Sequence, residues 1–236
     1  PTAMGWPQSV ALQGELEQGL QGAAVGSPEQ RRYGDLLEEV RRLKLIIRKL
    51  LLLSLADAGQ LEPNPRRLNL SGMVAALGED VGVLGPALTV ETTVAPDLWV
   101  NGDAELLEQV LQNLGSNAVK YNRPGGTVQV RLARHGSQAE LTVSNTGPGI
   151  PPEDRERVFE RFYRADKARG RQVEGVGLGL SLAREIARAH HGDLLLAEAR
   201  AGLTTFKLVL PLAPDAPAPT SAANPPPGSP SAPSAP

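Results

Sequence analysis

The sequence predicts an α+β protein in which a helical hairpin precedes an α/β sandwich. Apolar residues recur three and four positions apart across residues 8–24 and 28–57, which is the period of amphipathic helices. From about residue 70, three further helical patterns are interleaved with short runs of alternating polarity that end at Gly- and Pro-containing turns. Such an order predicts a mixed, largely antiparallel sheet with helices on one face.

Composition limits the possible functions before any motif is considered. The chain has 236 residues, enough for a sizeable core in one or two domains. Its formal net charge of −2 gives no basis for nucleic-acid binding. The absence of cysteine excludes disulfides, thiolate metal sites and a cysteine nucleophile, and it suits a reducing cytosol. The apolar runs fall far short of the roughly 20 residues that cross a bilayer. The chain starts at Pro1 without a basic and apolar leader, which suggests a fragment or a processed product.

The first two helices are expected to pack side by side. The first carries leucines four positions apart, at Leu12, Leu16 and Leu20. The second begins at Ser27-Pro28-Glu29, a capping residue followed by a proline in the first turn, and runs to about Asp57. It carries the seam of a coiled coil at Leu36, Val40, Leu43, Ile47 and Leu50. Dimerisation into a four-helix bundle would bury this seam. Packing of both helices on the following domain is the alternative.

Glu62-Pro63-Asn64-Pro65 is a linker, because proline interrupts a helix there twice. We therefore expect the hairpin to occupy residues 1–62 and the sandwich residues 66–212. Within the sandwich the patterns predict helices over residues 71–84, 104–121 and 178–189, and strands over residues 88–93, 98–100, 127–133, 139–144, 193–197 and 204–210. Residues 213–236 are rich in Pro, Ala and Ser, and they are expected to form a disordered tail because they carry too little apolar surface.

Four side chains share one face of the helix predicted over residues 104–121. They lie at relative positions i, i+4, i+7 and i+8, and they are Asn113, Asn117, Lys120 and Tyr121. Two amide oxygens one turn apart can contribute to an Mg²⁺ shell that water and phosphate oxygens complete. The lysine adds a positive charge toward phosphate. Caps, or hydrogen bonds across a buried helix, would account for the two asparagines without a ligand.

Two glycine-containing loops follow. Asn145-Thr-Gly147-Pro-Gly149-Ile150 permits close backbone approach and positive φ, as a loop around a flat base requires. Gly175-Val-Gly177-Leu178-Gly179-Leu180 precedes a helix, whose first N–H groups favour phosphate. The spacing of the second loop differs from the dinucleotide fingerprint GxGxxG, because Leu180 stands where the third glycine would be.

Between these loops, Val158-Phe159-Glu-Arg161-Phe162-Tyr163-Arg164 leads into a basic segment that glycines bound. The segment has the composition of a mobile lid whose cations reach a γ-phosphate, or of a solvated loop without a ligand; its cations are Lys167, Arg169 and Arg171. Phe159 and Phe162 are expected to form its apolar root. His190 and His191 end the following helix, where we expect a structural role.

With Thr204-Thr205-Phe206 in the last hairpin, five stretches stand in one order. This order resembles the N, G1, F, G2 and G3 boxes of the ATP-binding domain of sensor histidine kinases. The resemblance covers about residues 103–211 and extends more loosely back to residue 11. Each box alone is a weak signal, whereas five in register at ordinary spacing are specific. The resemblance implies the fold shared by histidine kinases, gyrase and MutL, the GHKL type of ATPase.

The resemblance also implies ATP and Mg²⁺ as ligands. The implied nucleotide contacts are Asn113, Asn117, Lys120, Tyr121, Asn145, Gly147, Gly149, Ile150, Arg161, Arg164, Gly175, Gly177, Leu178, Gly179, Leu180 and Thr205, with Asn117 and Asn113 as the metal ligands. The family usually has Asp where this chain has Asn145, as some heavy-metal-responsive sensor kinases also do. An amide oxygen accepts the hydrogen bond of the adenine amino group without charge assistance, so we expect a weakened but retained affinity for ATP.

The phosphoacceptor histidine of the family has no counterpart in the chain. The stretch from Ala11 to Glu17 resembles the one that follows the histidine motif, and counting back places Ala3 at the nucleophile and Met4 at the neighbouring acid. Neither side chain can accept a phosphoryl group or a proton. We therefore expect no autophosphorylation of this chain at the customary site.

The sequence thus predicts the ATP-binding catalytic portion of a sensor histidine kinase, which transfers the γ-phosphate of ATP to a histidine. The alternative is a degenerate, non-catalytic ATP-binding or dimerisation module that regulates another kinase. An anti-sigma-type Ser/Thr kinase on the same fold is disfavoured by the helical hairpin. The implied partners are a second copy of the chain, the receiver domain of a response regulator, and a His-bearing kinase in trans. The implied location is the cytoplasm, or the cytoplasmic end of a membrane sensor.

Overall fold

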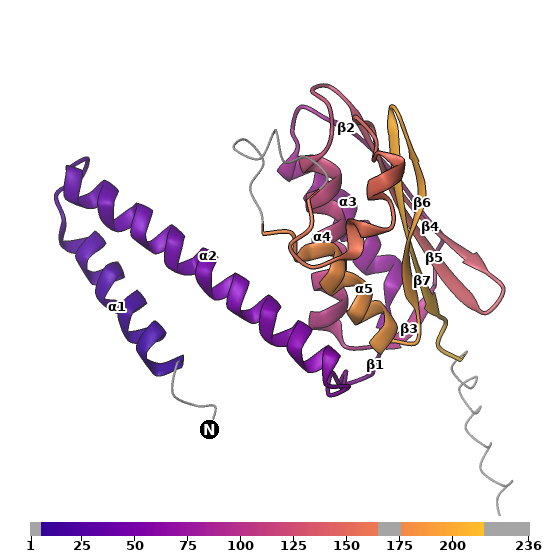
Figure 1. The fold of residues 1–236 in the computed structure, drawn as a ribbon, viewed down its shortest axis with the longest axis horizontal. Helices are drawn as coiled ribbons and strands as arrows, with labels where there is room; N and C mark the ends of the chain where they lie inside the picture. The colour runs from indigo at the N-terminus through magenta and orange to yellow at the C-terminus, as the bar shows by residue number, and fades with distance from the viewer. Residues whose placement is uncertain (1–5, 165–175, 215–236) are drawn as a thin grey trace, which may run out of the picture.

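The computed structural model describes residues 6–164 and 176–214. Within them the chain forms a helical hairpin that projects from a two-layer α/β sandwich (Figure 1). The predicted α+β class is therefore confirmed. In the described residues, no helix combines the length and the apolar character that a membrane span requires.

The hairpin consists of α1 (Trp6–Gly22) and α2 (Pro28–Asp57). Ser27 caps α2 as predicted, because its Oγ accepts the backbone N–H of Gln30 at 3.1 Å. Pro28 occupies the first turn, where a missing N–H costs no helical hydrogen bond.

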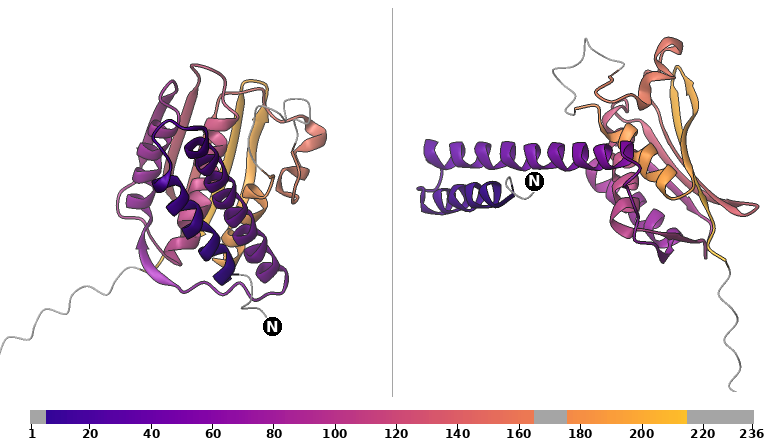
Figure 2. Two further views of the ribbon diagram at one scale, coloured as in Figure 1. Left: turned by 90° about the vertical axis from the view of Figure 1, so that its left-hand side faces the viewer. Right: turned by 60° about the horizontal axis from the view of Figure 1, so that its bottom comes forward.

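α1 packs along the N-terminal half of α2 (Figure 2). Lys44 Nζ of α2 donates to Gln13 Oε1 of α1 at 2.6 Å. A Cβ built on Gly19 would lie 2.6 Å from the ring of Tyr33, so the two helices meet closely at a residue without a side chain. The C-terminal half of α2 is left for contact with the sandwich.

Five strands form the main sheet in the order β2-β4-β5-β7-β6. They are β2 (Thr89–Val94), β4 (Thr127–His135), β5 (Gln138–Asn145), β6 (Asp193–Arg200) and β7 (Leu203–Pro211). The β2–β4 pair is parallel and the other pairs are antiparallel, which agrees with the predicted mixed sheet. One face of the sheet is covered by the helices α3 (Leu70–Leu84), α4 (Ala104–Lys120) and α5 (Gly179–Ala189) (Figure 1).

Three short elements were not predicted. β1 (Arg66–Asn69) pairs antiparallel with β3 (Trp99–Gly102) in a separate two-stranded sheet. The 3₁₀ helices η1 (Pro152–Asp154) and η2 (Arg157–Phe159) lie between the two glycine loops. β1 has four residues between Pro65 and the start of α3, too few to display an alternation of polarity.

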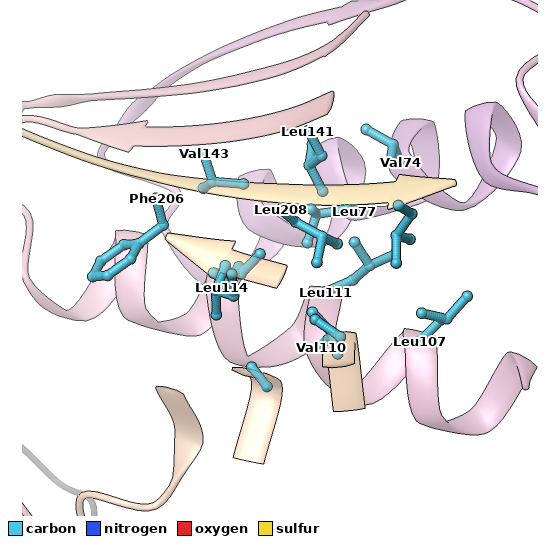
Figure 3. Close-up of a cluster of buried hydrophobic side chains, with 14 of the residues drawn as sticks. Val74, Leu77, Leu107, Val110, Leu111, Leu114, Leu141, Val143, Phe206 and Leu208 are labelled. Atoms are coloured by element: carbon cyan, nitrogen blue, oxygen red, sulfur yellow. The ribbon is translucent and has the colours of Figure 1, made fainter. Parts of the chain in front are cut away.

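The core lies between the sheet and its helices. Figure 3 shows apolar side chains of α3 and α4 meeting those of β5 and β7; all are buried, and the labelled ones are Val74, Leu77, Leu107, Val110, Leu111, Leu114, Leu141, Val143, Phe206 and Leu208. The four labelled residues of α4 recur three and four positions apart and form one stripe. This stripe sets the rotation of α4 and therefore the direction of its polar face.

The C-terminal half of α2 docks on the sandwich next to α5 (Figure 2). Leu53 is 1% exposed and is continuous with the core of the sandwich. The predicted coiled-coil seam is largely uncovered within one chain, since Leu36, Leu43, Ile47 and Leu50 are 38–56% exposed. The hairpin is thus attached to the sandwich by one end while most of its seam faces outward.

Candidate functional site

The polar face of α4 opens toward the start of α5. Asp103 caps α4 through its Oδ1, which accepts the N–H of Leu106 at 3.2 Å. One turn apart on the helix, Asn113 is 5% exposed and Asn117 is half-buried. The helix ends at Tyr121, whose N–H bonds the carbonyl of Asn117 at 3.0 Å. The predicted arrangement of polar groups on one helix face is present.

Asn113 joins three helices. Its Oδ1 accepts a hydrogen bond from Lys49 Nζ of α2 at 3.4 Å, and a Cβ built on Gly179 of α5 would lie 3.2 Å from the same oxygen. Burial lowers the pKa of Lys49. The Asn113 Nδ2 is buried and has no hydrogen-bond partner, the one such side-chain atom among the described side chains of residues 11–164 and 176–214. A buried amide left unsatisfied costs about 1–3 kcal/mol, so this atom marks a place where a polar ligand group would be favourable.

Asn145 ends β5 beside the C-terminus of α4 and is 4% exposed. Its Nδ2 donates to the carbonyl oxygens of Tyr121 at 3.1 Å and of Thr146 at 3.2 Å. Both partners are acceptors, so the amide nitrogen must face them and Oδ1 is turned the other way. The Asn145 carboxamide therefore presents an acceptor, the group that a base amino group requires.

The loop after β5 is held against its surroundings by close backbone contact. A Cβ on Gly147 would lie 2.4 Å from the Tyr121 carbonyl oxygen, and one on Gly149, whose φ is +79°, would lie 2.5 Å from that of Arg200. The carbonyl of Gly147 accepts the N–H of Gly202 from the β6–β7 turn at 3.0 Å. Glycine is required at both positions because no side chain fits there. Ile150 follows the loop and packs against the core.

The second glycine loop is bound to the segment around η2. The carbonyl of Gly177 accepts the N–H of Phe162 at 2.9 Å, and Gly177 has a φ of +76°. Leu178 is buried and precedes α5, whose N-terminus has no side-chain cap. Gly179 and Leu180 form its first turn, and uncapped N–H groups at a helix start favour an anion.

Phe159 and Phe162 differ in their surroundings. Phe159 packs against the core, edge-to-face with Phe206 at 6.1 Å between ring centroids, and the Arg184 guanidinium lies 4.6 Å from its ring. Phe162 is 58% exposed with a φ of +61°. Phe159 thus has the packed, apolar position expected of it and Phe162 does not, while the lid that both were expected to anchor lies outside the described residues.

Arg161 is bound to the helical hairpin. Its guanidinium donates to both carboxylate oxygens of Asp57, and its Nη2 donates to the carbonyl of Leu53 at 3.5 Å. The hydrogen bond to Asp57 raises the pKa of Arg161, and the same bond lowers the pKa of Asp57. Arg161 is therefore committed to α2 in this arrangement, and its predicted nucleotide contact stays a prediction.

Lys120 and Tyr121 lie together at the end of α4. Lys120 Nζ is 5.3 Å from the centroid of the Tyr121 ring, a cation–π arrangement, and Tyr121 is 38% exposed. Arg164 is half-buried at the edge of the described residues. The expected phosphoacceptor position Ala3, Met4, Gly175 and the lid cations Lys167, Arg169 and Arg171 lie outside the described residues.

One predicted site residue lies on the opposite face of the sheet. In β7, Thr205 stands across from Ser144, and their hydroxyl oxygens are 2.9 Å apart. Thr204 stands across from Asn145, on the face that the helices cover. Because side chains alternate along a strand, Thr204 and not Thr205 accompanies Asn145. The alternation with the core residue Phe206 was the available sequence signal.

His190 has the structural role that its position predicted. It is 4% exposed; its Nε2 accepts the N–H of Asp103 at 2.9 Å, and its Nδ1 lies 2.8 Å from the carbonyl of Ile186. These partners require a neutral ring with the proton on Nδ1. Burial lowers the pKa of His190, which favours that neutral form. The ring ties the start of α4 to the end of α5.

The arrangement fits a nucleotide with a divalent cation. The two amide side chains of α4, the uncapped start of α5 and the loop after Asn145 come together around the polar face of α4. The unsatisfied Nδ2 of Asn113 is a buried donor that a ligand could satisfy, and the close packing of Gly147 and Gly149 on the backbone fixes the loop beside it. Asn113 and Asn117 supply neutral oxygens of the kind that Mg²⁺ binds together with water and phosphate.

Sequence reasoning missed Lys49, Asp57 and Thr204 as residues of this region. Lys49 and Asp57 reach the sandwich from α2, at sequence separations of 64 residues from Asn113 and 104 residues from Arg161. For Lys49 and Asp57, the only signal in the sequence was the apolar stripe of α2, which is wider than a two-helix seam requires and indicates a second neighbour.

Comparison with known proteins identifies the family. The family described as "Histidine kinase-, DNA gyrase B-, and HSP90-like ATPase" matches residues 102–214. The sensor-like histidine kinase SenX3 of Mycobacterium tuberculosis is 36% identical over 199 residues, which are 83% of this chain and 48% of SenX3. The sensor histidine kinase CusS of Escherichia coli is 36% identical over 176 residues, 74% of this chain and 36% of CusS.

The chain therefore spans about half of SenX3 and about a third of CusS. The solved structure of the mycobacterial sensor histidine kinase MprB superposes with a TM-score of 0.57 at 34% identity. The match covers 63% of this chain and 99% of the MprB structure. The chain is 34% identical to MprB over almost the whole of that structure, and it carries the five boxes in order. It therefore belongs to the sensor histidine kinase family.

Proposed function

We propose that the chain is the ATP-binding catalytic portion of a sensor histidine kinase, in which residues 66–212 bind ATP and residues 1–62 form the dimerisation hairpin. The observation that carries the proposal is the buried Asn113 Nδ2, which has no hydrogen-bond partner and lies on the same helix face as Asn117, beside the uncapped start of α5. The family match and the similarity to named sensor kinases support the same assignment.

The base would lie at the Asn145 end of the site. The Asn145 Oδ1 would accept a hydrogen bond from the exocyclic amino group of adenine, and the partly exposed ring of Tyr121 lies at the same end of the site. Thr204 lies across from Asn145 on the same face of the sheet and supplies a hydroxyl. An amide acceptor gives a hydrogen bond of about 1 kcal/mol, compared with about 1.5–3 kcal/mol for a charged one. We therefore expect a moderate affinity for ATP.

The phosphates would lie at the start of α5. Gly179 and Leu180 direct backbone N–H groups away from the helix, and Lys120 contributes a cation from the end of α4. Asn117 and Asn113 would hold Mg²⁺, which neutralises charge on the phosphates when it is bound. Arg164 is the last described residue before the basic segment. We propose that Arg164 and Gly175 also contact the phosphates.

The proposed reaction is transfer of the γ-phosphoryl group to a histidine. An imidazole nitrogen forms a bond to the γ-phosphorus, the bond from that phosphorus to the bridging oxygen breaks, and ADP leaves. Within the given residues Ala3 stands at the expected position of the nucleophile, and the proposed source of the acceptor is a His-bearing kinase in trans. A second copy of the chain and the receiver domain of a response regulator complete the proposed partners.

Two measurements test the proposal. Calorimetric titration of the folded chain with Mg-ATP should show binding, and Asn117→Ala should weaken it; the absence of heat from folded protein would refute the proposal. The chain should then transfer labelled γ-phosphate to a kinase that carries the histidine but lacks its own ATP site, while remaining unlabelled itself. Acid-labile, base-stable phosphate on this chain would show that the acceptor assignment is wrong.

Position 3 also favours a second candidate function. An alanine cannot accept a phosphoryl group, which is compatible with a chain that binds ATP and regulates another kinase without transferring phosphate. Binding of Mg-ATP together with no transfer to the His-bearing partner would identify this non-catalytic module.

A further inference from the structure

The loop that follows Asn145 rests on the hairpin formed by β6 and β7. The carbonyl of Gly147 accepts the N–H of Gly202 at 3.0 Å. A Cβ built on Gly149 would lie 2.5 Å from the carbonyl oxygen of Arg200, so the two backbones also meet closely there. Both contacts involve backbone atoms, and the loop needs no side chain of its own to make them.

Arg155 adds a side-chain link between the same two elements. It directly follows η1, and its Nε donates to the carbonyl of Ile150, at the end of the loop, at 3.3 Å. Its Nη2 donates to the carbonyl of Ala199, a buried residue of the edge strand β6. A guanidinium carries several N–H donors in one plane, so a single side chain can hold two carbonyls at once. Arg155 therefore fixes the position of the loop relative to β6.

The position of the loop in turn affects the side chain of Asn145. Thr146 is the first residue of the loop, and its carbonyl accepts Asn145 Nδ2 at 3.2 Å. The second bond of this Nδ2 goes to the carbonyl of Tyr121 at 3.1 Å, at the end of α4. If the loop shifts, the bond to Thr146 is lost and the carboxamide can turn its NH₂ group toward the site instead of its oxygen. An acceptor at this place suits an amino purine, whereas a donor suits an oxo purine.

We propose that Arg155 is a positioning residue that sets the preference of the site for an amino purine over an oxo purine nucleotide. It acts through the loop and the orientation of Asn145, and not by contact with the base. The inference rests on the proposed function of this site and adds a specificity-determining residue that lies outside the five boxes.

The first test compares the dissociation constants of Mg-ATP and Mg-ITP for the full chain, measured by calorimetry. Inosine triphosphate (ITP) carries an oxo group where ATP carries the exocyclic amino group. The parent should bind Mg-ATP more tightly than Mg-ITP. Arg155→Met removes the N–H donors, and it should reduce this preference by about threefold or more, as expected when a neutral hydrogen bond is weakened.

The ratio of the two constants separates positioning from a general loss of structure. A variant with a smaller folded fraction binds both nucleotides more weakly by the same factor, so its ratio does not change. Arg155→Lys keeps a donor that can reach one carbonyl, and it should restore the preference in part. Arg134→Met is the matched control, because Arg134 Nε also donates to a backbone carbonyl, that of Gly136 at 3.1 Å, at the opposite end of β5 from Asn145. It should keep the ratio of the parent.

The second test measures the link itself, in the chain without nucleotide. The N–H of Gly202 bonds the carbonyl of Gly147, which should slow its exchange with solvent deuterium. This amide should exchange faster in Arg155→Met than in the parent, whereas Arg134→Met should exchange like the parent. The measurement does not depend on binding of ATP.

An unchanged ratio of dissociation constants in Arg155→Met overturns the inference, and so does unchanged exchange at Gly202. A parent that binds Mg-ATP without preferring it to Mg-ITP also overturns the inference but leaves the proposed function intact. If the folded parent binds neither nucleotide, the proposed function is wrong and the inference is wrong with it.

Discussion

Two backbone carbonyl oxygens, both hydrogen-bond acceptors, orient the side-chain amide of Asn145. Its Nδ2 donates to the carbonyls of Tyr121 and Thr146, so the residue uses one end for the fold and presents the other to the site. An Asp at this position would place a carboxylate oxygen against two carbonyl oxygens. The chain has thus replaced a charged acceptor by one that also stabilises the loop after β5.

Asn145→Asp is therefore expected to destabilise the fold. Two buried hydrogen bonds become repulsive contacts, which should lower the free energy of unfolding by about 1–3 kcal/mol at neutral pH. Urea denaturation at pH 7 measures the change. Ser144→Asn, on the opposite face of the same strand, is the control and should have a smaller effect. An Asp variant as stable as the parent would show that the loop does not depend on these bonds.

His190 makes stability depend on pH. Burial lowers its pKa below the ordinary value of about 6.5, so the unfolded chain binds a proton more readily than the fold does. The carboxylate of Asp103 opposes this shift, and His191 reinforces it. The stability that the neutral ring contributes is fully present above pH 6.5 and is lost as the pH falls through the folded pKa.

Denaturation between pH 7.5 and 5 should therefore show a steeper loss of stability for the parent than for His190→Gln, which accepts the Asp103 N–H without titrating. His135→Gln is the control, since His135 is exposed at the end of β4. It should retain the steeper dependence of the parent. Equal slopes for the parent and His190→Gln would contradict the role assigned to the buried ring.

At the scale of elements, the site depends on how closely the loops approach α4. A Cβ on Gly147 would lie 2.4 Å from the carbonyl of Tyr121, which is backbone and cannot move without unwinding the end of α4. Gly147→Ala should cost about 1–3 kcal/mol of stability, as overpacking does. It should also weaken Mg-ATP in calorimetric titration, because the Asn145 end of the site is displaced.

Gly82→Ala is the control for this substitution. Gly82 lies in α3, and a Cβ built there meets no atom within 4 Å. Alanine in a helix interior should raise stability by roughly 0.5–1 kcal/mol and leave the nucleotide affinity unchanged. If Gly147→Ala behaves like this control, the loop does not pack on α4 in solution.

The predictable part of the fold was local. α2 begins at the predicted cap and ends at Asp57 as predicted, and α4 and α5 differ from expectation by one residue at a terminus. Capping and hydrophobic period are encoded within a few residues, so a single sequence reveals them. β1 was not predicted, because four residues beside a proline show no periodicity of polarity. Thr205 was selected instead of Thr204 because a sequence motif does not state which face of a strand is turned toward the core.

At the scale of the whole molecule, the sequence predicted a hairpin and a sandwich, with their packing as an alternative, but not the residues that join them. Lys49–Asn113 and Asp57–Arg161 join residues 64 and 104 positions apart, and nothing in either local pattern indicates the partner. These contacts follow from the packing of Leu53 next to α5, which only the folded arrangement defines. The boxes thus predict the members of the candidate site, which stay a prediction, whereas nothing in them indicates its connection to the hairpin.

The uncovered seam of α2 leads to the last prediction. Leu43 is 49% exposed and Ile47 is 56% exposed, on a helix that projects from the sandwich (Figure 2). Burying such a seam against a second copy would contribute about 25 cal/mol per Å² of apolar surface, enough to favour a four-helix bundle. Sedimentation of the parent should show a dimer, and Leu43→Glu with Ile47→Glu should give a monomer. Val83→Glu is the control, because Val83 is apolar and 81% exposed but lies on α3, and it should leave the dimer intact. A parent that sediments as a monomer at high concentration would contradict burial of the seam between two copies.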